Sequence, residues 1–347
     1  MSLYDHRLSR RAFVAGGIAA ALALAGCGQQ NQTSASAASA TGGASTGSKT
    51  IRIGFAGNAG EVSLIESAAV AYKEGFLDEE LGKVGYTAQY QGFSQAGPAI
   101  NEAFSSSSLD VAEYGDLPGY TVASKGIGVK AFATATSQND MGILVAPNSG
   151  ISTVADLKGK RVVVGFGTVM QRYLLESLAK ENISANDLSL INSVMDGPTM
   201  IAGGQADAFV SVLSMLYPLE QKGTGTVVIT SKDDESLSAT ILFFGRDQYL
   251  KENPDAAKAI IRALKRAKDY AAQNPDKARD DLATKTTTGD TIAKVYDDDT
   301  FASFDPKISD DVKAKLEGLG EFAIQNKIVT KQVSVDDLVD TSYYEEA

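Results

Sequence analysis

From residue 51 to about residue 245, the chain alternates short apolar runs with amphipathic stretches. Apolar runs bounded by glycine and polar turns are typical of buried strands. We expect strands at 51–55, 87–91, 109–114, 129–135, 142–146, 161–166, 187–192, 206–210 and 239–245. The stretches between them place apolar residues every three or four positions and predict helices that pack on the sheets. This alternation indicates an α/β protein with mostly parallel sheets flanked by helices.

Several predicted helices have recognisable start signals. Pro98 and Pro254 suit the first helical position, and Thr168 and Asn253 suit the N-cap, where a side chain can accept a backbone N–H. The predicted helices start near 61, 98, 118 and 168 and cover 197–204, 254–273, 275–285, 289–297 and 308–326.

The order of elements is repeated, which predicts two lobes of similar design. The segments "GPAINEAFSSSSLDVAEY" (97–114) and "GPTMIAGGQADAFV" (197–210) each hold a Gly-Pro helix start, a turn of small residues, an aspartate and an apolar strand. The strand at 239–245 is expected to return to the first lobe. The predicted lobes are residues 51–138 with 236–347, and residues 139–235.

The first 27 residues have the pattern of an export signal. Three arginines precede an apolar stretch at 12–26, which is short for a membrane span of about 20 residues but normal for a signal peptide. The segment "SRRAF" (9–13) resembles a twin-arginine signature, and "LAGC" (24–27) resembles a lipobox. We expect Cys27 to carry a lipid that anchors the protein outside the cytoplasm, on the outer face of the cytoplasmic membrane or in the periplasm. An uncleaved anchor or a buried helix is the alternative, and general secretory export remains open.

Residues 28–49 are nearly all Ser, Ala, Gly, Thr and Gln, without an aromatic residue. Such a stretch cannot bury enough apolar area to fold, so it predicts a flexible tether between the lipid and the body.

The charge and the rare residues limit the possible chemistry. The chain has a net charge of −11, and the part after Cys27 holds 29 basic against 42 acidic residues, or −13. This charge argues against nucleic-acid binding. His6 and Cys27 are the only histidine and cysteine, and tryptophan is absent. A body without histidine or cysteine excludes metal sites of those residues and His-dependent nucleophilic catalysis, and we expect no cofactor.

An ordered set of segments resembles the type-II solute-binding proteins of bacterial ABC importers, in the nitrate/sulfonate/taurine-type group that also contains pyrimidine-precursor binders. The resemblance covers about 51–285 and is carried by "IRIGF", "AYKEGFLDEEL", "GFSQAGPAINEAF", "LDVAEYGDLPGYTVASKG", "ILVAPNSGISTVADLKGKRVVVGFGT", "GQADAFV" and "KENPDAAKAIIRALKRA". It implies a two-lobed fold with the ligand between the lobes, an ABC permease with its ATPase as partner, and a monomer. The stretch "SVLSMLYP" (211–218) lacks the tryptophans often found there in sulfonate binders.

In such a fold the cleft lies at the carboxyl ends of the strands, where helix N-termini can bind an anion without Lys or Arg. The predicted ligand-binding residues are Asn58, Ser94, Gln95, Gly97, Asp116, Gly167, Thr168, Val169, Asp196 and Phe209. Each could instead serve only as a cap or turn residue. Asp116 and Asp196 could bind a ligand ammonium group or cap a helix, and Arg172 could reach an acidic ligand or form a surface salt bridge. Met170, Met195 and Met215 could line the cleft with Phe209 or fill the core.

We therefore expect a lipid-anchored binding component of an importer for a small anion, with a sulfonate or taurine-like solute favoured. Nitrate, an aromatic acid and a pyrimidine precursor are alternative ligands. A receptor that presents ligand to a membrane sensor is an alternative role. An enzyme is disfavoured, because the related thiamin-precursor synthases use a histidine and a cysteine cluster that this body lacks.

Overall fold

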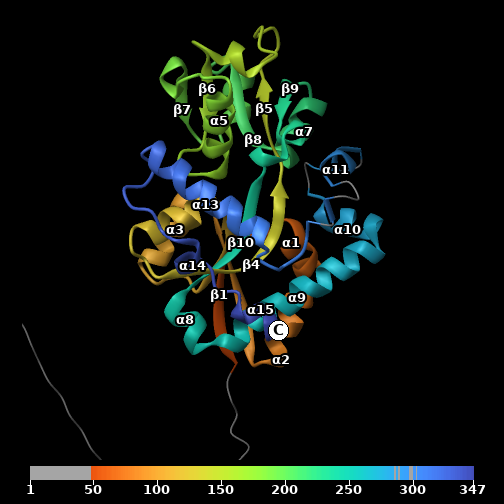
Figure 1. Ribbon diagram of the computed structural model, residues 1–347. Coiled ribbons are helices and arrows are strands. Elements are labelled where there is room, and N and C mark those ends of the chain that lie inside the picture. The colour runs from red at the N-terminus through yellow and green to blue at the C-terminus, as the bar shows by residue number, and fades with distance from the viewer. Residues whose placement is uncertain (1–47, 285–286, 288–289, 297–299, 302) are drawn as a thin grey trace, which may run out of the picture. The chain divides into compact units, whose positions relative to one another are not determined.

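The computed structural model describes residues 48–284, 287, 290–296, 300–301 and 303–347. The predicted signal peptide, Cys27 and the predicted tether up to residue 47 lie outside this part of the chain. The described chain contains two mixed sheets, each with helices on both faces (Figure 1). The predicted α/β class is confirmed.

The first sheet is formed by strands from two distant parts of the sequence. Its strands are β1 (Lys49–Ala56), β2 (Tyr86–Phe93), β3 (Val111–Gly115), β4 (Val129–Asn139) and β10 (Ala239–Arg246), in the order β2-β1-β3-β10-β4. β1 is parallel to β2 and β3, whereas β10 is antiparallel to β3 and β4. The prediction that the strand after the second lobe returns to the first sheet is therefore confirmed.

The second sheet repeats this arrangement. Its strands are β5 (Met141–Val145), β6 (Arg161–Val164), β7 (Ser189–Asn192), β8 (Ala208–Val212) and β9 (Thr226–Thr230), in the order β7-β6-β8-β5-β9. β6 is parallel to β7 and β8, and β5 is antiparallel to β8 and β9. In each sheet one strand is antiparallel to its neighbours: β10 in the first sheet and β5 in the second. Each of these strands is the one by which the chain enters that sheet from the other lobe.

Helices cover both faces of each sheet because all faces are apolar. The helices beside the first sheet are α1 (Glu66–Lys73), α2 (Phe76–Lys83), α3 (Gly97–Ser105), α4 (Asp116–Ser124), α8 (Asp247–Glu252), α9 (Pro254–Gln273), α10 (Pro275–Leu282), α13 (Asp310–Gln325), α14 (Val335–Leu338) and α15 (Ser342–Glu345). Along β10, Phe243 packs with α1, α2 and α9, whereas Leu242 and Phe244 pack with α3, α4 and α13 on the other face. This alternation is the period of a strand buried on both sides.

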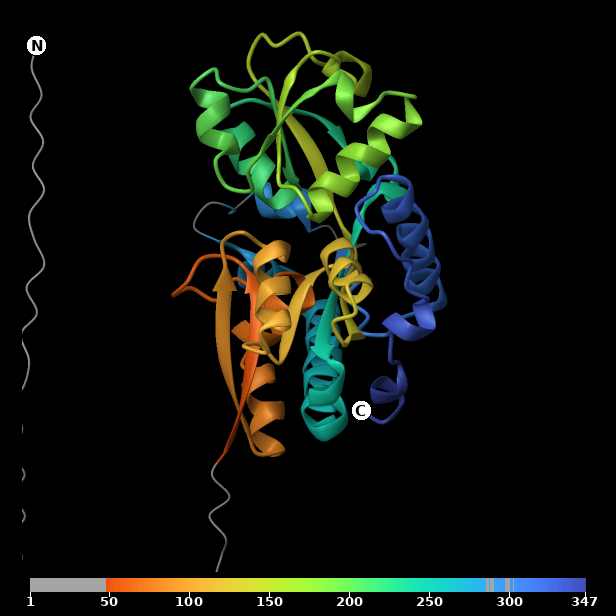
Figure 2. The ribbon, with the colours of Figure 1, turned by 90° about the vertical axis from the view of Figure 1, so that its left-hand side faces the viewer.

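The second sheet, drawn mainly in green above the first in Figure 2, is covered in the same way. Its helices are α5 (Val169–Lys180), α6 (Gly197–Ala202) and α7 (Leu213–Gln221), with α11 (Asp290–Val295) beside α7. Thr287 Oγ1 donates a hydrogen bond to the Ser214 carbonyl at 2.8 Å, and Thr291 Oγ1 donates to Gln221 Oε1 at 3.1 Å. The segment around α11 thus contacts the second lobe, although the sequence assigned it to the first.

Two chain crossings join the lobes. β4 passes to β5 through Asp140, and β9 passes to β10 through 231–238. Asp140 Oδ1 accepts hydrogen bonds from the hydroxyls of Ser231 and Ser238 at 2.7 and 2.8 Å, and the Ser231 hydroxyl accepts one from the Met141 N–H at 3.0 Å. These bonds tie the two crossings to one another.

Tertiary contacts shift some predicted boundaries. β1 begins at Lys49, within the predicted tether, because Lys49 and Thr50 pair with β2 at Tyr86 and Thr87. α1 begins at Glu66 rather than near 61. The Ile65 N–H, just before this helix, is instead bonded to the Glu113 carboxylate of β3.

Two predicted N-caps occupy the cap position without capping. Thr168 precedes α5, but its hydroxyl donates backwards to the Gly165 carbonyl at 2.6 Å. Asn253 precedes α9, but its Oδ1 accepts from the Tyr86 hydroxyl at 2.8 Å and its amide donates to the Tyr249 carbonyl. The Gly165 and Tyr249 partners are local, whereas the Tyr86 partner of Asn253 is remote in the sequence.

A candidate ligand cleft between the lobes

A small cavity of about 100 Å³ lies between the two lobes. The residues that line it come from both lobes: Ala56, Ser63, Ile65, Ala96, Gly97, Glu113, Tyr114, Gly115, Pro118, Asn139, Thr168, Val169, Met170, Val212 and Ile241. These residues include the starts of α3 and α4 from the first lobe and of α5 from the second. Because the first turn of a helix carries unpaired N–H groups and a positive dipole end, such a meeting point suits an anion.

The helix starts at the cavity are not capped by their own side chains. The N-cap residues of α1, α3, α4 and α5 make no side-chain cap hydrogen bond. Glycine allows two of these starts to pack closely. A Cβ on Gly97 would lie 2.4 Å from Pro118 Cβ, and a Cβ on Gly115 would lie 2.3 Å from Val169 Cγ1 in the other lobe.

The predicted binding residues fall into three groups. Gly97, Thr168 and Val169 line the cavity. Ser94, Gln95 and Asp196 line a separate hollow of about 380 Å³, where the loop before α3 faces residues 192–196 of the second lobe. The two hollows meet along one stretch of chain, because Ala96 and Gly97 line the first and Ser94, Gln95 and Pro98 line the second.

The remaining predicted residues lie elsewhere. Asn58 is exposed and lines neither hollow, and Phe209 is buried in the core beneath Gly197. Gly167 has a φ of +71° and forms the turn into α5, where its N–H donates to Gln171 Oε1 at 2.8 Å. Of the methionines, Met170 lines the cavity and Met195 lines the hollow of about 380 Å³. Met215 packs against the core and also lines a third hollow between the lobes, of about 260 Å³.

Asp116 joins the lobes instead of lining the cavity. Its Oδ2 accepts from Arg172 Nη1 at 2.5 Å and from the Thr240 N–H at 3.1 Å, and its Oδ1 accepts from the Leu117 N–H at 2.6 Å. Arg172 also pairs with Glu176 at 3.0 Å. Asp116 is 1% exposed and Arg172 is 5% exposed, so the surface salt bridge expected for Arg172 is in fact a buried ion pair between lobes. Both charges are therefore neutralised within the protein.

Four polar residues of the cavity wall were not predicted from the sequence: Ser63, Glu113, Tyr114 and Asn139. Glu113 lies in the middle of β3, is 3% exposed, and has both carboxylate oxygens 3.2 Å from the Ile65 N–H. Burial raises the pKa of Glu113 well above its usual range. Asn139 ends β4, and its Nδ2 donates to Glu66 Oε1 at 2.8 Å. One sequence signal could have identified Glu113: it is a glutamate inside the apolar run "LDVAEY", and charged side chains are rarely buried in a strand that is covered on both faces.

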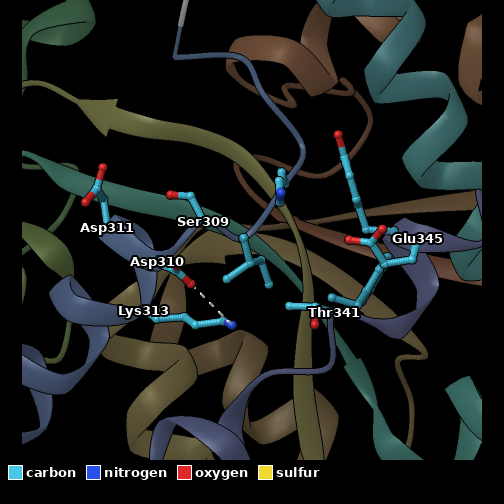
Figure 3. A pocket seen from close by; sticks show the side chains of 10 residues that line it. Ser309, Asp310, Asp311, Lys313, Thr341 and Glu345 are labelled. Carbon is cyan, nitrogen blue, oxygen red and sulfur yellow. Dashed lines mark ion pairs between the residues drawn. The ribbon is translucent and has the colours of Figure 1, made fainter.

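A larger hollow of about 460 Å³ lies on the first lobe, away from the cleft. It is lined by residues 307–313 and 341–345 together with Phe132. Figure 3 shows its charged rim, where Lys313 pairs with Asp310 at 3.8 Å. Because the second lobe contributes none of its lining residues, we place the candidate site in the cleft.

Two further features, a membrane-spanning helix and a metal-binding cluster, are absent from the described residues. None of their helices combines the length and apolar character that a bilayer crossing requires. They also contain no cluster of three or more His, Cys, Asp or Glu side chains that could hold a metal ion.

Comparison with known proteins identifies the family of this chain. The family model described as NMT1/THI5 like matches residues 102–278. A Bacillus subtilis protein named for the binding of aliphatic sulfonates is 25% identical over 337 residues, which cover 95% of each chain. The yeast 4-amino-5-hydroxymethyl-2-methylpyrimidine phosphate synthase THI12 is 22% identical over 193 residues, or 52% of this chain and 56% of its own.

Solved structures share the arrangement of the two lobes. The periplasmic sulfonate-binding protein SsuA from Methylobacillus flagellatus matches with a TM-score of 0.72 at 22% identity, over 86% of this chain and 94% of its own. The agreement extends through both lobes, so it confirms the predicted two-lobed architecture. This chain therefore belongs to the NMT1/THI5-like family and has the two-lobed fold of periplasmic binding proteins.

Proposed function

We propose that this protein is the substrate-binding component of an ABC importer. It captures a small anion by closure of its lobes and delivers it to a membrane permease, while a lipid on Cys27 holds it outside the cytoplasm. The observation that carries this proposal is the meeting of helix starts from both lobes at one cavity. Closure of two lobes around a ligand gives a permease two distinguishable shapes to recognise.

A sulfonate is the favoured ligand class. The cavity can bind an anion through backbone N–H groups alone, which suits a protein of net charge −11. Arg172 does not have to bind the anion, and its charge is already compensated by ion pairs with Asp116 and Glu176. The names of the Bacillus and Methylobacillus relatives support the same ligand class.

We assign no reaction to the cleft. The yeast relative is named as a synthase, but the only histidine and cysteine of this chain are His6 and Cys27, ahead of the described residues. The polar side chains of the cavity wall include Glu113, Asn139 and Thr168, and none is paired with a partner that would make it a nucleophile.

A ligand screen tests the proposal. The chain from residue 28 onwards should gain thermal stability with short alkanesulfonates or aminosulfonates, by about 2.7 kcal/mol at a ligand concentration 100 times Kd. Nitrate, aromatic acids and aminopyrimidines form the comparison set. Absence of any shift across the whole set would contradict a solute-binding role, whereas a shift with nitrate alone would change the ligand class.

A charge placed in the cavity locates the site. Met170→Glu adds a carboxylate to the cavity wall in the first turn of α5, where helices tolerate acidic residues. We expect at least tenfold weaker anion binding, measured by calorimetry. The control is Ile324→Glu, which adds the same charge to an exposed position of α13 and should leave the affinity unchanged. Equal affinities of the two variants would place the anion elsewhere.

A further inference from the structure

Two glutamates are buried near one another at the cavity between the lobes. Glu113 of β3 lines the cavity wall, Glu66 is the first residue of α1, and each is 3% exposed. The Ile65 N–H, which directly precedes Glu66 in the chain, lies 3.2 Å from both carboxylate oxygens of Glu113. The charge of Glu66 also acts on Glu113, so the two carboxyl groups form one electrostatic pair.

No cation compensates this pair within the described part of the chain. The titratable groups that face it are Asp140 of the chain crossing and Tyr296, which follows α11, and no lysine, arginine or histidine acts on either carboxyl group. Burial raises the pKa of Glu66 to about 8 and that of Glu113 well above its usual range. Buried carboxyl groups without a cation, beside a like charge, favour their protonated form.

The hydrogen bonds around the pair show the same shortage of donors. Asn139 lines the cavity, is 6% exposed, and donates from Nδ2 to Glu66 Oε1 at 2.8 Å. Glu66 Oε2 and Asn139 Oδ1 are buried and find no hydrogen-bond partner among the described residues. Buried acceptors are rarely left unpaired in native proteins, and the proton of a carboxylic acid is a donor that can fill this gap.

Glu113 lies where an anion in the cavity would be held. The cavity has a volume of about 100 Å³, and Gly115, two residues after Glu113 on β3, directly precedes α4. Residues two apart on a strand face the same side, about 7 Å apart along the strand. An anion bound at the start of α4 is therefore close enough for an ionised Glu113 to repel it. A protonated Glu113 can instead donate its O–H to the anion, as can the Ser63 hydroxyl at the same wall.

We propose that Glu113 binds the anion as a protonated acid, so that the cleft holds the anion together with a proton. This inference rests on the proposed function and adds the regulation of the same site by pH. The proton stays on Glu113 and forms an O–H hydrogen bond to the anion, and no covalent bond is made or broken.

The direction of the pH dependence follows from linkage. The two carboxyl groups titrate as a unit, and the first proton leaves the pair near pH 8, where Glu66 ionises. Anion affinity is therefore complete while the pair holds its protons, and it falls as the pH rises above this value.

Calorimetry with propane-1-sulfonate and with nitrate tests the proposal on the unmodified protein, because both anions keep their charge at neutral and alkaline pH. The affinity should be equal at about pH 6 and about pH 7 and at least tenfold weaker at about pH 9.5. A constant affinity over this range would overturn this inference but support the proposed function. Failure of both anions to bind at every pH would contradict the proposed function itself.

Two matched variants assign the effect to Glu113. Glu113→Gln keeps the shape of the side chain and offers an N–H donor in place of the O–H donor. Its affinity at about pH 7 should change less than threefold, and it should lose less than threefold at about pH 9.5. Glu66→Gln removes the same group from a residue that does not line the cavity, and it should keep the tenfold loss.

The two variants also define the results that would refute the role of Glu113. At least tenfold tighter binding in Glu113→Gln at about pH 7 would mean that an ionised Glu113 repels the anion in the unmodified protein. Equal pH dependence in the two variants would remove the assignment to Glu113.

A proton count on the unmodified protein covers the case in which the variants do not fold. At about pH 9, where the free pair has lost part of its protons, binding of propane-1-sulfonate should take up as much as one proton per anion. The uptake is measured from binding enthalpies in two buffers with different enthalpies of ionisation. Binding without proton uptake at this pH, or with proton release, would rule out the protonated contact.

Discussion

At the residue scale, the described chain buries its carboxylates in different surroundings. Asp116 and Arg172 form a buried pair between the lobes, whereas Glu113 lies at the cavity wall without an ion pair among the described residues. Glu66 of α1 lies near Glu113, and its burial raises its pKa to about 8, an effect that the hydrogen bond from Asn139 partly opposes. The same type of side chain thus serves as a structural tie in one place and as a candidate ligand contact in another.

Asp116→Asn should destabilise the protein strongly. Among the described residues, the substitution leaves the buried Arg172 guanidinium with Glu176 as its remaining ion-pair partner, and removal of one member of a buried pair costs about 3–5 kcal/mol. Urea denaturation measures the loss. The control is Asp247→Asn, which removes an exposed pair with Lys251 and should cost at most about 1 kcal/mol. Equal effects of the two substitutions would contradict the structural role of Asp116.

At the element scale, one buried carboxylate holds two helices of the first lobe together. Glu80 of α2 accepts hydrogen bonds from Arg262 and Arg266 of α9 at 3.0 and 2.9 Å, and from Lys83 at 2.7 Å. Burial alone would raise the pKa of Glu80, but these three partners lower it to about 2. Arg262 and Arg266 of α9 therefore dock this helix on α2.

Glu80→Gln should lower the free energy of unfolding by about 2 kcal/mol at neutral pH. Because the folded pKa lies below the usual value, the contribution is complete above about pH 4.5 and is lost as the pH falls towards 2. The difference between variant and parent should therefore shrink over that range, as measured by urea denaturation. Glu79→Gln, whose side chain is 58% exposed, is the control and should cost less than about 0.5 kcal/mol. A pH-independent difference would argue against the ionised form of Glu80.

At the scale of the whole molecule, the two sheets have the same arrangement of strands, and the chain passes between them twice. β10 enters the first sheet after the second lobe is complete, and β5 enters the second sheet directly from β4. Because the chain crosses twice, the lobes share Asp140 and residues 231–238, and this is the region about which closure would occur. The cleft near this region is lined by residues of both lobes, so a ligand bound there would contact both of them.

The proposed location of the protein outside the cytoplasm depends on the predicted lipid at Cys27. We expect Cys27→Ala to move the protein from the membrane fraction to the soluble fraction, because the thiol that would carry the lipid is gone. Ser34→Ala in the predicted tether is the control and should leave the protein with the membrane. Immunoblots of the two fractions measure the outcome. Membrane association that survives in Cys27→Ala would contradict the lipid anchor.

Local pattern predicted the elements well, because strand and helix periodicities are written in neighbouring residues. The strands at 109–114 and 239–245 were found within two residues, and Pro98 and Pro254 lie in the first turns of α3 and α9. Thr168 and Asn253 occupy the predicted N-cap positions of α5 and α9, but their side chains do not cap the helices, because each bonds to other partners in the folded chain.

The sequence by itself determined the α/β class, the two lobes and the absence of histidine and cysteine after residue 27, since these follow from periodicity, repeated order and composition. Tertiary structure alone decided which polar residues meet. Gly97, Thr168 and Val169 meet at the cavity, while Asn58 and Phe209 do not. The pairing of Asp116 with Arg172 and of Asn139 with Glu66 spans more than fifty residues in each case. Such contacts depend on how separate helices and strands pack, and no local pattern encodes that distance.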